Sequence, residues 1–334
     1  MNRRNLLKSA VAIGMGAPLA SLATATPAQA AGNYDVLVTE QVKNKVMLFR
    51  AIELWTPEKL GWEWAAPAQS AWARLNDARF RETDRFGWVC MVAAGGGKVG
   101  MVNFGDDDAL LWSATPGGNP HAVEYLRSHG VVVVASSSPV SSALPYEGYL
   151  SVYAPTNADD PATLGAEPVH RIEYTGAHGL WWDGSFLYAL GSWTLAKYRV
   201  TGSLKSAKLE LVQKYVWPTR FDGHSLDMDF SDPDKLVLNG AQAIWTVDKA
   251  DVTRLTNIRP QSPGVKSFAR AVDGESFWLQ SVDVTDPVPG QSRWWNEYVQ
   301  FFDPTGKPSY RRGLDYYGYE GRFYRARIAS TRLV

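Results

Sequence analysis

Short runs of alternating polar and apolar residues follow one another along most of the chain, and helical spacing of apolar residues is scarce. The runs are rich in β-branched and aromatic residues, and Asp-Gly, Gly-Gly and Pro-Thr-Gly turns separate them. This alternation predicts half-buried strands joined by hairpins, and therefore an all-β fold. The strands are expected at residues 35–39, 45–49, 88–93, 98–104, 131–135, 149–153, 171–174, 186–190, 195–200, 235–238, 243–247, 276–279 and 297–302.

One line of sequence recurs along the chain and opens a strand each time. It runs from Gly176 to Gly184, and residues 119–124 and 222–227 repeat it, while residues 264–268 carry lysine in place of histidine. The repeats are about 42 to 59 residues apart, and each interval contains several short strands. Four strands per repeat of this length are typical of a β-propeller blade.

The repeats divide the chain into six blades, of which five begin near Asp77 and at His121, His178, His224 and Lys266. The first blade starts at residue 35 without an innermost strand, whereas residues 322–328 form a strand with no hairpin partner after it. Pairing these two ends would close the ring and remove an exposed sheet edge at each terminus. Residues 31–334 are therefore expected to form a single six-bladed β-propeller, with a seventh blade possible because residues 54–76 are long enough to contain further strands.

Two insertions are expected to lie on the same face of the propeller. They span residues 136–148 in the third blade and 282–296 in the sixth, and each falls between the second and third strands. In a propeller those loops emerge where the innermost strands begin. Both should therefore border the channel mouth that carries the histidines of the repeat.

The N-terminus resembles an export signal. Residues 2–8 match the twin-arginine motif, a modest apolar stretch follows, and Ala28-Gln29-Ala30 is a small-residue cleavage site. The stretch is interrupted by glycine and proline and is too short to span a bilayer. Residues 1–30 are therefore expected to be removed, leaving a protein exported to the periplasm or the exterior without membrane insertion.

Composition excludes several classes of function. The chain has 34 basic and 34 acidic residues, and loss of Arg3, Arg4 and Lys8 leaves 31 − 34 = −3. A net charge this close to zero does not indicate binding to nucleic acid or to an anionic membrane. Cys90 is the only cysteine, so no intramolecular disulfide can form. Phosphate-binding glycine loops, dinucleotide fingerprints and nucleophile elbows are lacking, so no nucleotide cofactor is expected.

Aligning the innermost strands places six basic or imidazole side chains at one equivalent position. They are Arg79, His121, His178, His224, Lys266 and Arg325. Such a ring at a channel mouth would suit an anion, because buried cations are rarely left uncompensated. The alternatives are that each histidine makes a structural hydrogen bond to a neighbouring blade, and that Glu82, Glu124 and Asp227 compensate the cations.

Within this ring, His121, His178 and His224 come from consecutive blades. Three converging imidazoles are candidate ligands of one divalent metal ion, zinc, manganese or calcium, and without a metal any of them could act as a general base. Arg79, Lys266 and Arg325 would then bind a carboxylate or a similar anion. Aromatic residues expected on the same face provide platforms for sugar rings, and those chosen are Trp294, Trp295, Tyr316 and Tyr317.

Several of these segments together resemble a family of exported bacterial β-propeller proteins of unassigned function. They are residues 38–41, 118–121, 176–179, 223–224 and 323–327. The resemblance covers nearly the whole mature chain and implies the fold but no activity. A looser similarity, of architecture only, is to propeller polysaccharide lyases that hold a metal with channel histidines.

The leading hypothesis is a secreted enzyme that cleaves an anionic, uronic-acid-containing glycan by β-elimination. Such a reaction needs a neutralised carboxylate and a base, and often a metal, which the ring could provide. A glycoside hydrolase would instead need two opposed carboxylates. A non-catalytic propeller that binds carbohydrate or another small anion is the third possibility.

Overall fold

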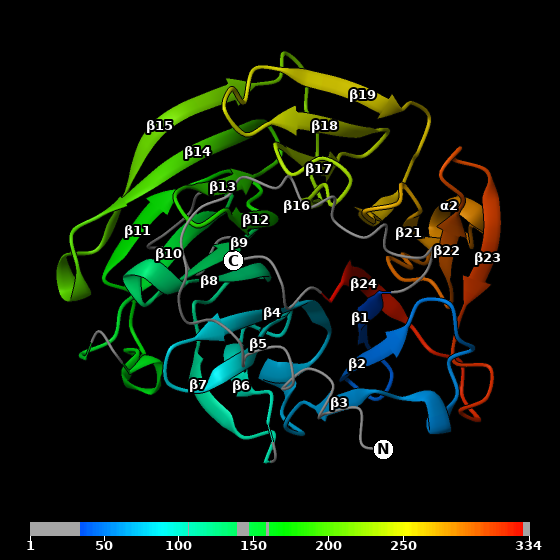
Figure 1. The fold of residues 1–334 in the computed structure, drawn as a ribbon, viewed down its shortest axis with the longest axis horizontal. Helices are drawn as coiled ribbons and strands as arrows, with labels where there is room; N and C mark the ends of the chain where they lie inside the picture. Colours follow the sequence, from blue (N-terminus) through cyan, green and yellow to red (C-terminus); the bar gives the residue numbers. More distant parts are fainter. Residues whose placement is uncertain (1–33, 106, 139–146, 158–159, 330–334) are drawn as a thin grey trace, which may run out of the picture.

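A computed structural model describes residues 34–105, 107–138, 147–157 and 160–329. Six four-stranded antiparallel sheets surround a central axis, with one strand of each sheet nearest the axis (Figure 1). The described part of the chain is therefore a six-bladed β-propeller, as the repeat predicted. Only one strand, β3, lies within residues 54–76, so that segment supplies no seventh blade.

Each blade is built from strands that follow one another in the chain, except the first. From the axis outwards the sheets are β24 (Phe323–Ile328), β1 (Asp35–Glu40), β2 (Lys45–Arg50), β3 (Trp62–Ala65); β4 (Leu75–Thr83), β5 (Gly87–Ala94), β6 (Val99–Asn103), β7 (Leu110–Ala114); β8 (Pro120–Leu126), β9 (Val131–Ser136), β10 (Tyr149–Tyr153), β11 (His170–Glu173); β12 (Gly179–Trp182), β13 (Leu187–Leu190), β14 (Thr194–Thr201), β15 (Lys208–Val216); β16 (Ser225–Met228), β17 (Lys235–Asn239), β18 (Ile244–Asp248), β19 (Leu255–Arg259); and β20 (Val265–Arg270), β21 (Ser276–Gln280), β22 (Val299–Phe302), β23 (Pro308–Arg312). The helical turns are η1 (Pro57–Lys59), η2 (Ser70–Trp72), η3 (Arg127–His129), η4 (Pro161–Thr163), η5 (Leu204–Ser206) and α2 (Val282–Thr285).

The ring closes by pairing the two ends of the described chain. Strand β24 forms the innermost strand of the first blade and pairs antiparallel with β1, with Arg325 opposite Thr39 and Arg327 opposite Leu37. Figure 1 shows the two strands side by side, red against blue. The predicted closure is confirmed, and it joins residues almost 300 positions apart into one sheet.

The outermost strands β3, β7, β15, β19 and β23 were not among the predicted runs. Strand β15 shows why, because most of its residues are exposed and the alternation of buried and exposed positions is lost. An outermost strand has a neighbour on one side only, and less of it lies between blades. In β15 polar residues are therefore tolerated on both faces and the periodic signal disappears, whereas β3 and β7 keep alternating burial and were missed although the pattern was present.

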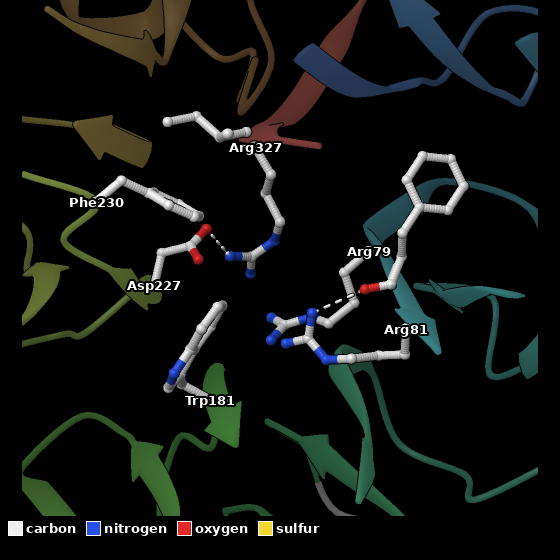
Figure 2. A pocket seen from close by; sticks show the side chains of 8 residues that line it. Arg79, Arg81, Trp181, Asp227, Phe230 and Arg327 are labelled. Atoms are coloured by element: carbon white, nitrogen blue, oxygen red, sulfur yellow. Dashed lines mark hydrogen bonds and ion pairs between the residues drawn. The ribbon is translucent and has the colours of Figure 1, made fainter. Parts of the chain in front are cut away.

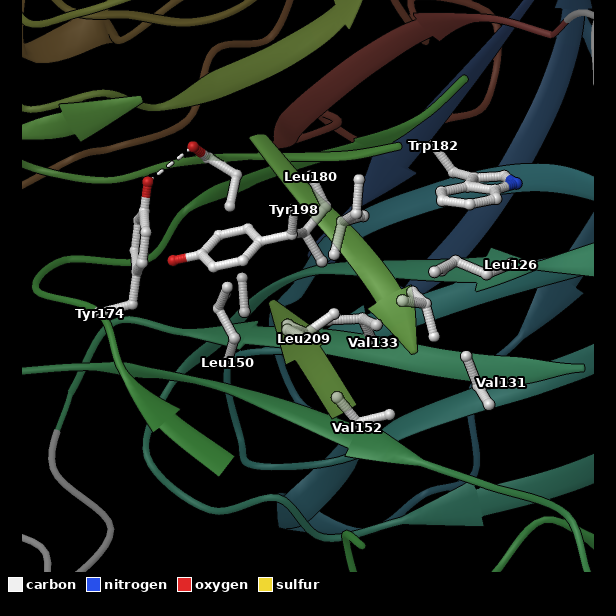
Figure 3. Close-up of a cluster of buried hydrophobic side chains, with 14 of the residues drawn as sticks. Leu126, Val131, Val133, Leu150, Val152, Tyr174, Leu180, Trp182, Tyr198 and Leu209 are labelled. Atoms are coloured by element: carbon white, nitrogen blue, oxygen red, sulfur yellow. Dashed lines mark hydrogen bonds between the residues drawn. The ribbon is translucent and has the colours of Figure 1, made fainter. Parts of the chain in front are cut away.

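Apolar side chains between adjacent blades form the core. The largest cluster lies between the third and fourth blades, where Val131 and Val133 pack toward Leu180 and Trp182 (Figure 3). Tyr174 completes it, because its hydroxyl donates a 2.7 Å hydrogen bond to the carbonyl of Ala189. Each fully buried side chain of this size contributes roughly 1.5–3 kcal/mol. This packing fixes each blade against the next and sets where the innermost strands begin.

Candidate functional site

The innermost strands begin with a recurring turn that positions the basic side chains. A residue with left-handed backbone lies two positions ahead of His178, His224 and Lys266, at Gly176, Asp222 and Gly264 respectively. At Gly176 a side chain could not be added, because a Cβ would come within 2.0 Å of the Ser192 hydroxyl. The turn therefore explains the glycines that the sequence repeat contains.

The three histidines gather at this channel mouth. The ring of His121 stacks on that of His178 with centroids 3.9 Å apart and planes inclined by 25°, and the ring of His224 lies 5.3 Å from that of His178. His121 reaches this level from a β-bulge, since the pairing of β8 with β9 skips one residue between Pro120 and Ala122. Consecutive blades thus place three imidazoles in contact.

The hydrogen bonds of the histidines fix their protonation. His178 and His224 each donate from Nδ1 to the carbonyl of the left-handed turn residue, at 2.8 Å to Gly176 and 2.7 Å to Asp222. A neutral imidazole has one N–H, so Nε2 is an acceptor in both rings. Lys266 uses that acceptor in His224, with its ammonium 3.0 Å from Nε2.

His121 has the same tautomer for a different reason. The Asn119 amide oxygen accepts a hydrogen bond from Asn76, so its NH2 group faces Nε2 of His121 and donates to it over 2.9 Å. Nδ1 of His121 then donates to the hydroxyl of Tyr324 at 3.2 Å. Among the described residues, His178 is the one member of the trio whose Nε2 has no hydrogen-bond partner.

Burial and neighbouring cations keep the three imidazoles neutral. Burial lowers the pKa of His178 to about 4, with smaller contributions from Arg325 and Lys266. Burial also holds the pKa of His224 well below the ordinary value, and Lys266 lowers it further. For His121, burial and the neighbouring His178 ring do the same. At neutral pH the trio therefore carries no charge.

Two cations lie against the neutral trio. Lys266, on β20, is only 4% exposed, and burial together with Arg325 lowers its pKa to about 8. Arg325, on β24, is 1% exposed and donates from Nη2 to the carbonyl of His224 at 2.8 Å. The mouth thus combines two positive charges with three uncharged imidazoles.

The trio was expected to be able to hold a divalent metal ion, and its arrangement does not fit a shared ion. Metal ligation uses a lone pair in the plane of the ring, and the lone pairs of stacked rings point along parallel planes and not to one point. In addition, Nε2 of His121 accepts from Asn119 and Nε2 of His224 accepts from Lys266. Within the described ranges, no group of three or more His, Cys, Asp or Glu residues is arranged to hold a metal ion.

Arg79 does not lie at the level where the repeat alignment placed it. The strand pairing provides a common reference level for the innermost strands, namely the residue that pairs with the next-to-last residue of the second strand. This residue is Asp77 in β4, Ala122 in β8 and Arg325 in β24. Arg79 is therefore two residues deeper than Arg325. The alignment was wrong at this position because it matched residue types and could not register the bulge at Asn76, between the pairs of Leu75 and Asp77.

The six residues consequently do not share one position. His121 and Lys266 lie in bulges one residue ahead of the common level, and His178 and His224 lie two residues ahead of it. Five of the six residues still contact one another at the mouth, because the bulges compensate for their different positions relative to this level. Arg79 is the exception and belongs to the interior of the channel.

The channel interior holds a network of buried ion pairs. Arg79 and Arg81 share the carboxylate of Glu124, and Arg79 also donates to Asp77 at 3.1 Å. Arg327 donates to Asp77 at 2.7 Å and also pairs with Asp227. Of the three acidic partners predicted from the sequence, Glu124 and Asp227 serve this network, whereas Glu82 pairs with Arg127.

The four residues of the predicted aromatic platform lie in four different surroundings. Trp294 is 56% exposed and its ring lies 4.8 Å from the ammonium of Lys266, so it borders the mouth. Trp295 lines a separate surface hollow of about 550 Å³, where Arg322 stacks on its ring at 4.4 Å. Tyr316 is 58% exposed, but Tyr317 packs edge-on against Phe49 in the core of the first blade. Tyr317 is therefore a core residue and not part of an exposed platform.

Sequence reasoning missed Tyr324, Asn119 and Asn76, which orient His121. Tyr324 and Asn76 occupy the bulge position that His121 and Lys266 occupy in their own blades. The sequence did contain a signal for two of them, because Tyr324 directly precedes Arg325 and Asn119 is the first residue of the repeated segment 119–124. A search restricted to basic residues could not select them.

Some sequence-based expectations fall outside the described residues. The export signal at residues 1–30 and most of the insertion at residues 136–148 are among them. The second insertion lies between β21 and β22, as expected, and brings Trp294 over the mouth. No helix in the described ranges has the length and apolar character needed to cross a membrane.

Comparison with known proteins supports the fold alone. No protein-family model matches the chain, and no curated protein matches it. A protein of unknown function from Bacteroides caccae is similar in structure, with a TM-score of 0.53 and 11% identity over 89% of this chain and all of that one. A functionally unknown protein from Desulfotomaculum acetoxidans DSM 771 has a TM-score of 0.50 and 10% identity over 83% of this chain and 78% of its own.

Proposed function

We propose that the histidine mouth of the channel binds the carboxylate of an anionic sugar, in an exported protein that takes its ligand from outside the cytoplasm. One observation carries the proposal: Lys266 is a buried ammonium with no described carboxylate in ion-pair contact, and Asp283 and Asp222 act on it only at longer range. Its hydrogen-bond partner is the neutral Nε2 of His224. A buried cation is costly unless an anion compensates it.

The surroundings of Lys266 suit a ligand carboxylate. Arg325 lies beside it: its Nε is buried without a hydrogen-bond partner among the described residues, and its Nη1 makes a 3.5 Å ion pair with Asp77. Hydrogen bonds from ammonium or guanidinium to a carboxylate are roughly twice as strong as neutral ones. Two cations in contact with three uncharged imidazoles attract a single negative charge without repelling the rest of the ligand.

A sugar is favoured among carboxylates because of Trp294. Its exposed ring lies within 4.8 Å of the Lys266 ammonium and presents a flat apolar surface beside a charged group. A uronic acid has both features in one residue, an apolar ring face and a carboxylate. The resemblance to exported bacterial propellers and the twin-arginine motif support an extracellular source for such a ligand.

β-Elimination is a second candidate function, favoured by the open acceptor of His178. Nε2 of this neutral imidazole would take the proton from C5 of a bound uronate, the electron pair would form the C4–C5 double bond, and the C4–O bond would break. The departing oxygen would take a proton from water to leave as a hydroxyl group, and the imidazolium of His178 would return its proton to solvent. Lys266 and Arg325 would stabilise the negative charge that develops on the carboxylate. A bound anion would also raise the low pKa of His178 and make it a better base.

The geometry favours neither a metal-dependent step nor a glycoside hydrolase. The stacked imidazoles do not converge on one ion, so no step is assigned to a metal. Hydrolysis of a glycosidic bond normally requires two carboxylates across the substrate. The channel carboxylates of Asp77, Glu124 and Asp227 are instead held by buried arginines.

Binding is tested by titrating the purified mature protein with oligosaccharides of polygalacturonate, alginate and hyaluronan, and with their carboxyl-reduced counterparts. We expect an acidic glycan to bind and its reduced form to fail. Lys266→Ala should weaken binding about 10-fold to 100-fold, as loss of a hydrogen bond to a charged group costs roughly 1.5–3 kcal/mol. Lys205→Ala, at an exposed lysine in η5, is the matched control. Equal binding of acidic and reduced glycans would overturn the proposal.

Catalysis is tested separately by the ultraviolet absorbance of the unsaturated uronate product. His178→Asn keeps a side-chain N–H that can donate to the Gly176 carbonyl but removes the base. Product formation should stop while binding of the glycan persists. If the wild type binds an acidic glycan without any rise in absorbance, the binding function stands and the lyase is excluded for that glycan.

A further inference from the structure

We propose a second, buried anion site deeper in the channel, which holds one small monovalent inorganic anion such as chloride. A cavity of about 10 Å³ lies there, lined by Arg79, Phe80, Arg81, Trp181, Asp227, Phe230, Arg327 and Ile328. Its volume is about that needed to hold one water molecule or small ion. The site goes beyond the glycan-binding mouth and does not depend on it.

The charges around this cavity do not balance. The described channel contains four buried arginines, Arg79, Arg81 and Arg327 in the interior and Arg325 between the interior and the mouth, and three buried acids, Asp77, Glu124 and Asp227. All three acids are already paired: Glu124 with Arg79 and Arg81, Asp77 with Arg79, Arg325 and Arg327, and Asp227 with Arg327. With Lys266 at the mouth, five buried cations face these three acids, so one positive charge is left over even when one anion is bound at the mouth, in a place where solvent screening is weak.

Two guanidiniums that line the cavity have nitrogen atoms without a partner. They are Nε of Arg79 and Nη2 of Arg327, both buried, in side chains that are 3% exposed. Figure 2 shows the guanidinium of Arg327 bound to Asp227 through one nitrogen, with another directed into the space toward Arg79 and Arg81. Arg79 on β4 and Arg327 on β24 come from neighbouring blades, and both side chains line the cavity.

The cavity needs an occupant that accepts hydrogen bonds from the unpartnered N–H groups and also neutralises the surplus charge. An anion does both, whereas a water molecule does only the first. Water can accept hydrogen bonds from Arg79 and Arg327, but it leaves the surplus charge unneutralised. A monovalent anion does both, and it accepts several N–H bonds at once. A carboxylate or sulfate is too large for a cavity of this size, which restricts the ligand to a halide or an ion of similar dimensions.

Chloride dependence of stability tests this site in solution. The protein is exchanged into a chloride-free buffer, and its melting temperature is followed as sodium chloride or sodium gluconate is added at matched ionic strength. Chloride should raise the melting temperature along a saturating curve and gluconate should not, because a ligand that binds only the native state stabilises it by mass action. Equal curves for the two salts would overturn the proposal.

Crystals soaked in bromide locate the ion. An anomalous peak between Arg79 and Arg327 is expected, and a peak only at the Lys266 mouth, or none, would contradict the buried site. Arg79→Met removes the surplus charge while Arg81 still neutralises Glu124, so chloride should no longer stabilise that variant. Arg127→Met, which alters a partly exposed arginine, should retain the effect. Should Arg79→Met fail to fold, the wild-type bromide peak decides by itself.

One further variant distinguishes the site at the mouth from the site in the interior. Lys266→Ala removes the cation on which the proposed glycan function rests but leaves the deeper network intact. It should lose glycan affinity and keep chloride stabilisation. Loss of both effects in Lys266→Ala would show that a single site at the mouth accounts for the anion dependence, and the buried site would be rejected.

Discussion

The ammonium of Lys266 donates a hydrogen bond to Nε2 of His224 over 3.0 Å, joining the sixth blade to the fifth at the channel mouth. The bond requires His224 to be neutral, because a protonated imidazole has no acceptor. The turn carbonyl of Asp222, which accepts from Nδ1, favours the same tautomer. A lysine and a histidine that must not both be charged thus face one another where a ligand anion is proposed to bind.

Replacing Lys266 by methionine should raise the pKa of His224. Burial is the larger cause of the low value and remains in the variant, so the pKa should move toward 6.5 without reaching it. The chain has five histidines, and their ring resonances can be followed by NMR across a pH titration. Lys205→Met is the control, and an unchanged His224 titration in Lys266→Met would contradict the contact.

Stability should fall as the pH is lowered from about 6.5 toward 4. Burial lowers the pKa of His178 from 6.5 to about 4, so the unfolded chain takes up a proton in this range before the folded protein does. The stability is thus complete above 6.5 and is lost as the pH falls to 4, by on the order of 3 kcal/mol from His178 alone. His121 and His224 shift in the same direction.

Urea denaturation at a series of pH values measures this loss. His178→Asn retains the N–H that faces Gly176 and removes the titration, so its stability should depend less steeply on pH between 6.5 and 4. A wild-type midpoint that is constant over this range would show that the trio is not neutral and buried in solution.

Asp77 should be among the most sensitive positions in the protein. It is fully buried and contacts Arg327, Arg79 and Arg325, and although burial alone would raise the pKa of Asp77, these three guanidiniums hold it well below the ordinary value. Asp77→Asn leaves three buried cations with one carboxylate fewer, at a cost of roughly 3–5 kcal/mol. Denaturant unfolding measures the difference.

Asp84 provides the comparison for that measurement, since it pairs with Arg127 and its side chain is 70% exposed. Removing an exposed partner of this kind costs less than about 1 kcal/mol. If Asp84→Asn lowered the free energy of unfolding as much as Asp77→Asn does, burial of the interior network would not be the reason for the sensitivity at Asp77.

Chelation should leave the protein unchanged. Because the imidazoles of His121 and His178 stack and the acceptors of His121 and His224 are engaged, treatment with EDTA is expected to leave the melting temperature where it was. Added zinc, manganese or calcium should not raise it at stoichiometric amounts. A fall with EDTA that zinc restores, and that His178→Asn abolishes, would show that the rings reorient to hold a metal after all.

Repetition made the fold readable from the sequence. The same turn and strand opener occur in blade after blade, so a weak signal at Gly264 was supported by stronger ones at Gly176 and Asp222. The unpaired strand expected at residues 322–328 predicted closure because a propeller with an open edge is unfavourable. Strand β15 escaped prediction, since a strand exposed on both faces has no alternation to detect.

The sequence by itself determined the type of residue at the mouth, namely imidazoles and cations at the start of successive innermost strands. It could not determine their height along the axis, because one bulged residue shifts a side chain by a full position without altering the pattern of residue types. Register therefore decided that His121, His178, His224, Lys266 and Arg325 meet while Arg79 joins Glu124 in the interior. The tertiary structure also decided the protonation of the trio, since desolvation and the approach of Lys266 arise only when blades distant in sequence pack together.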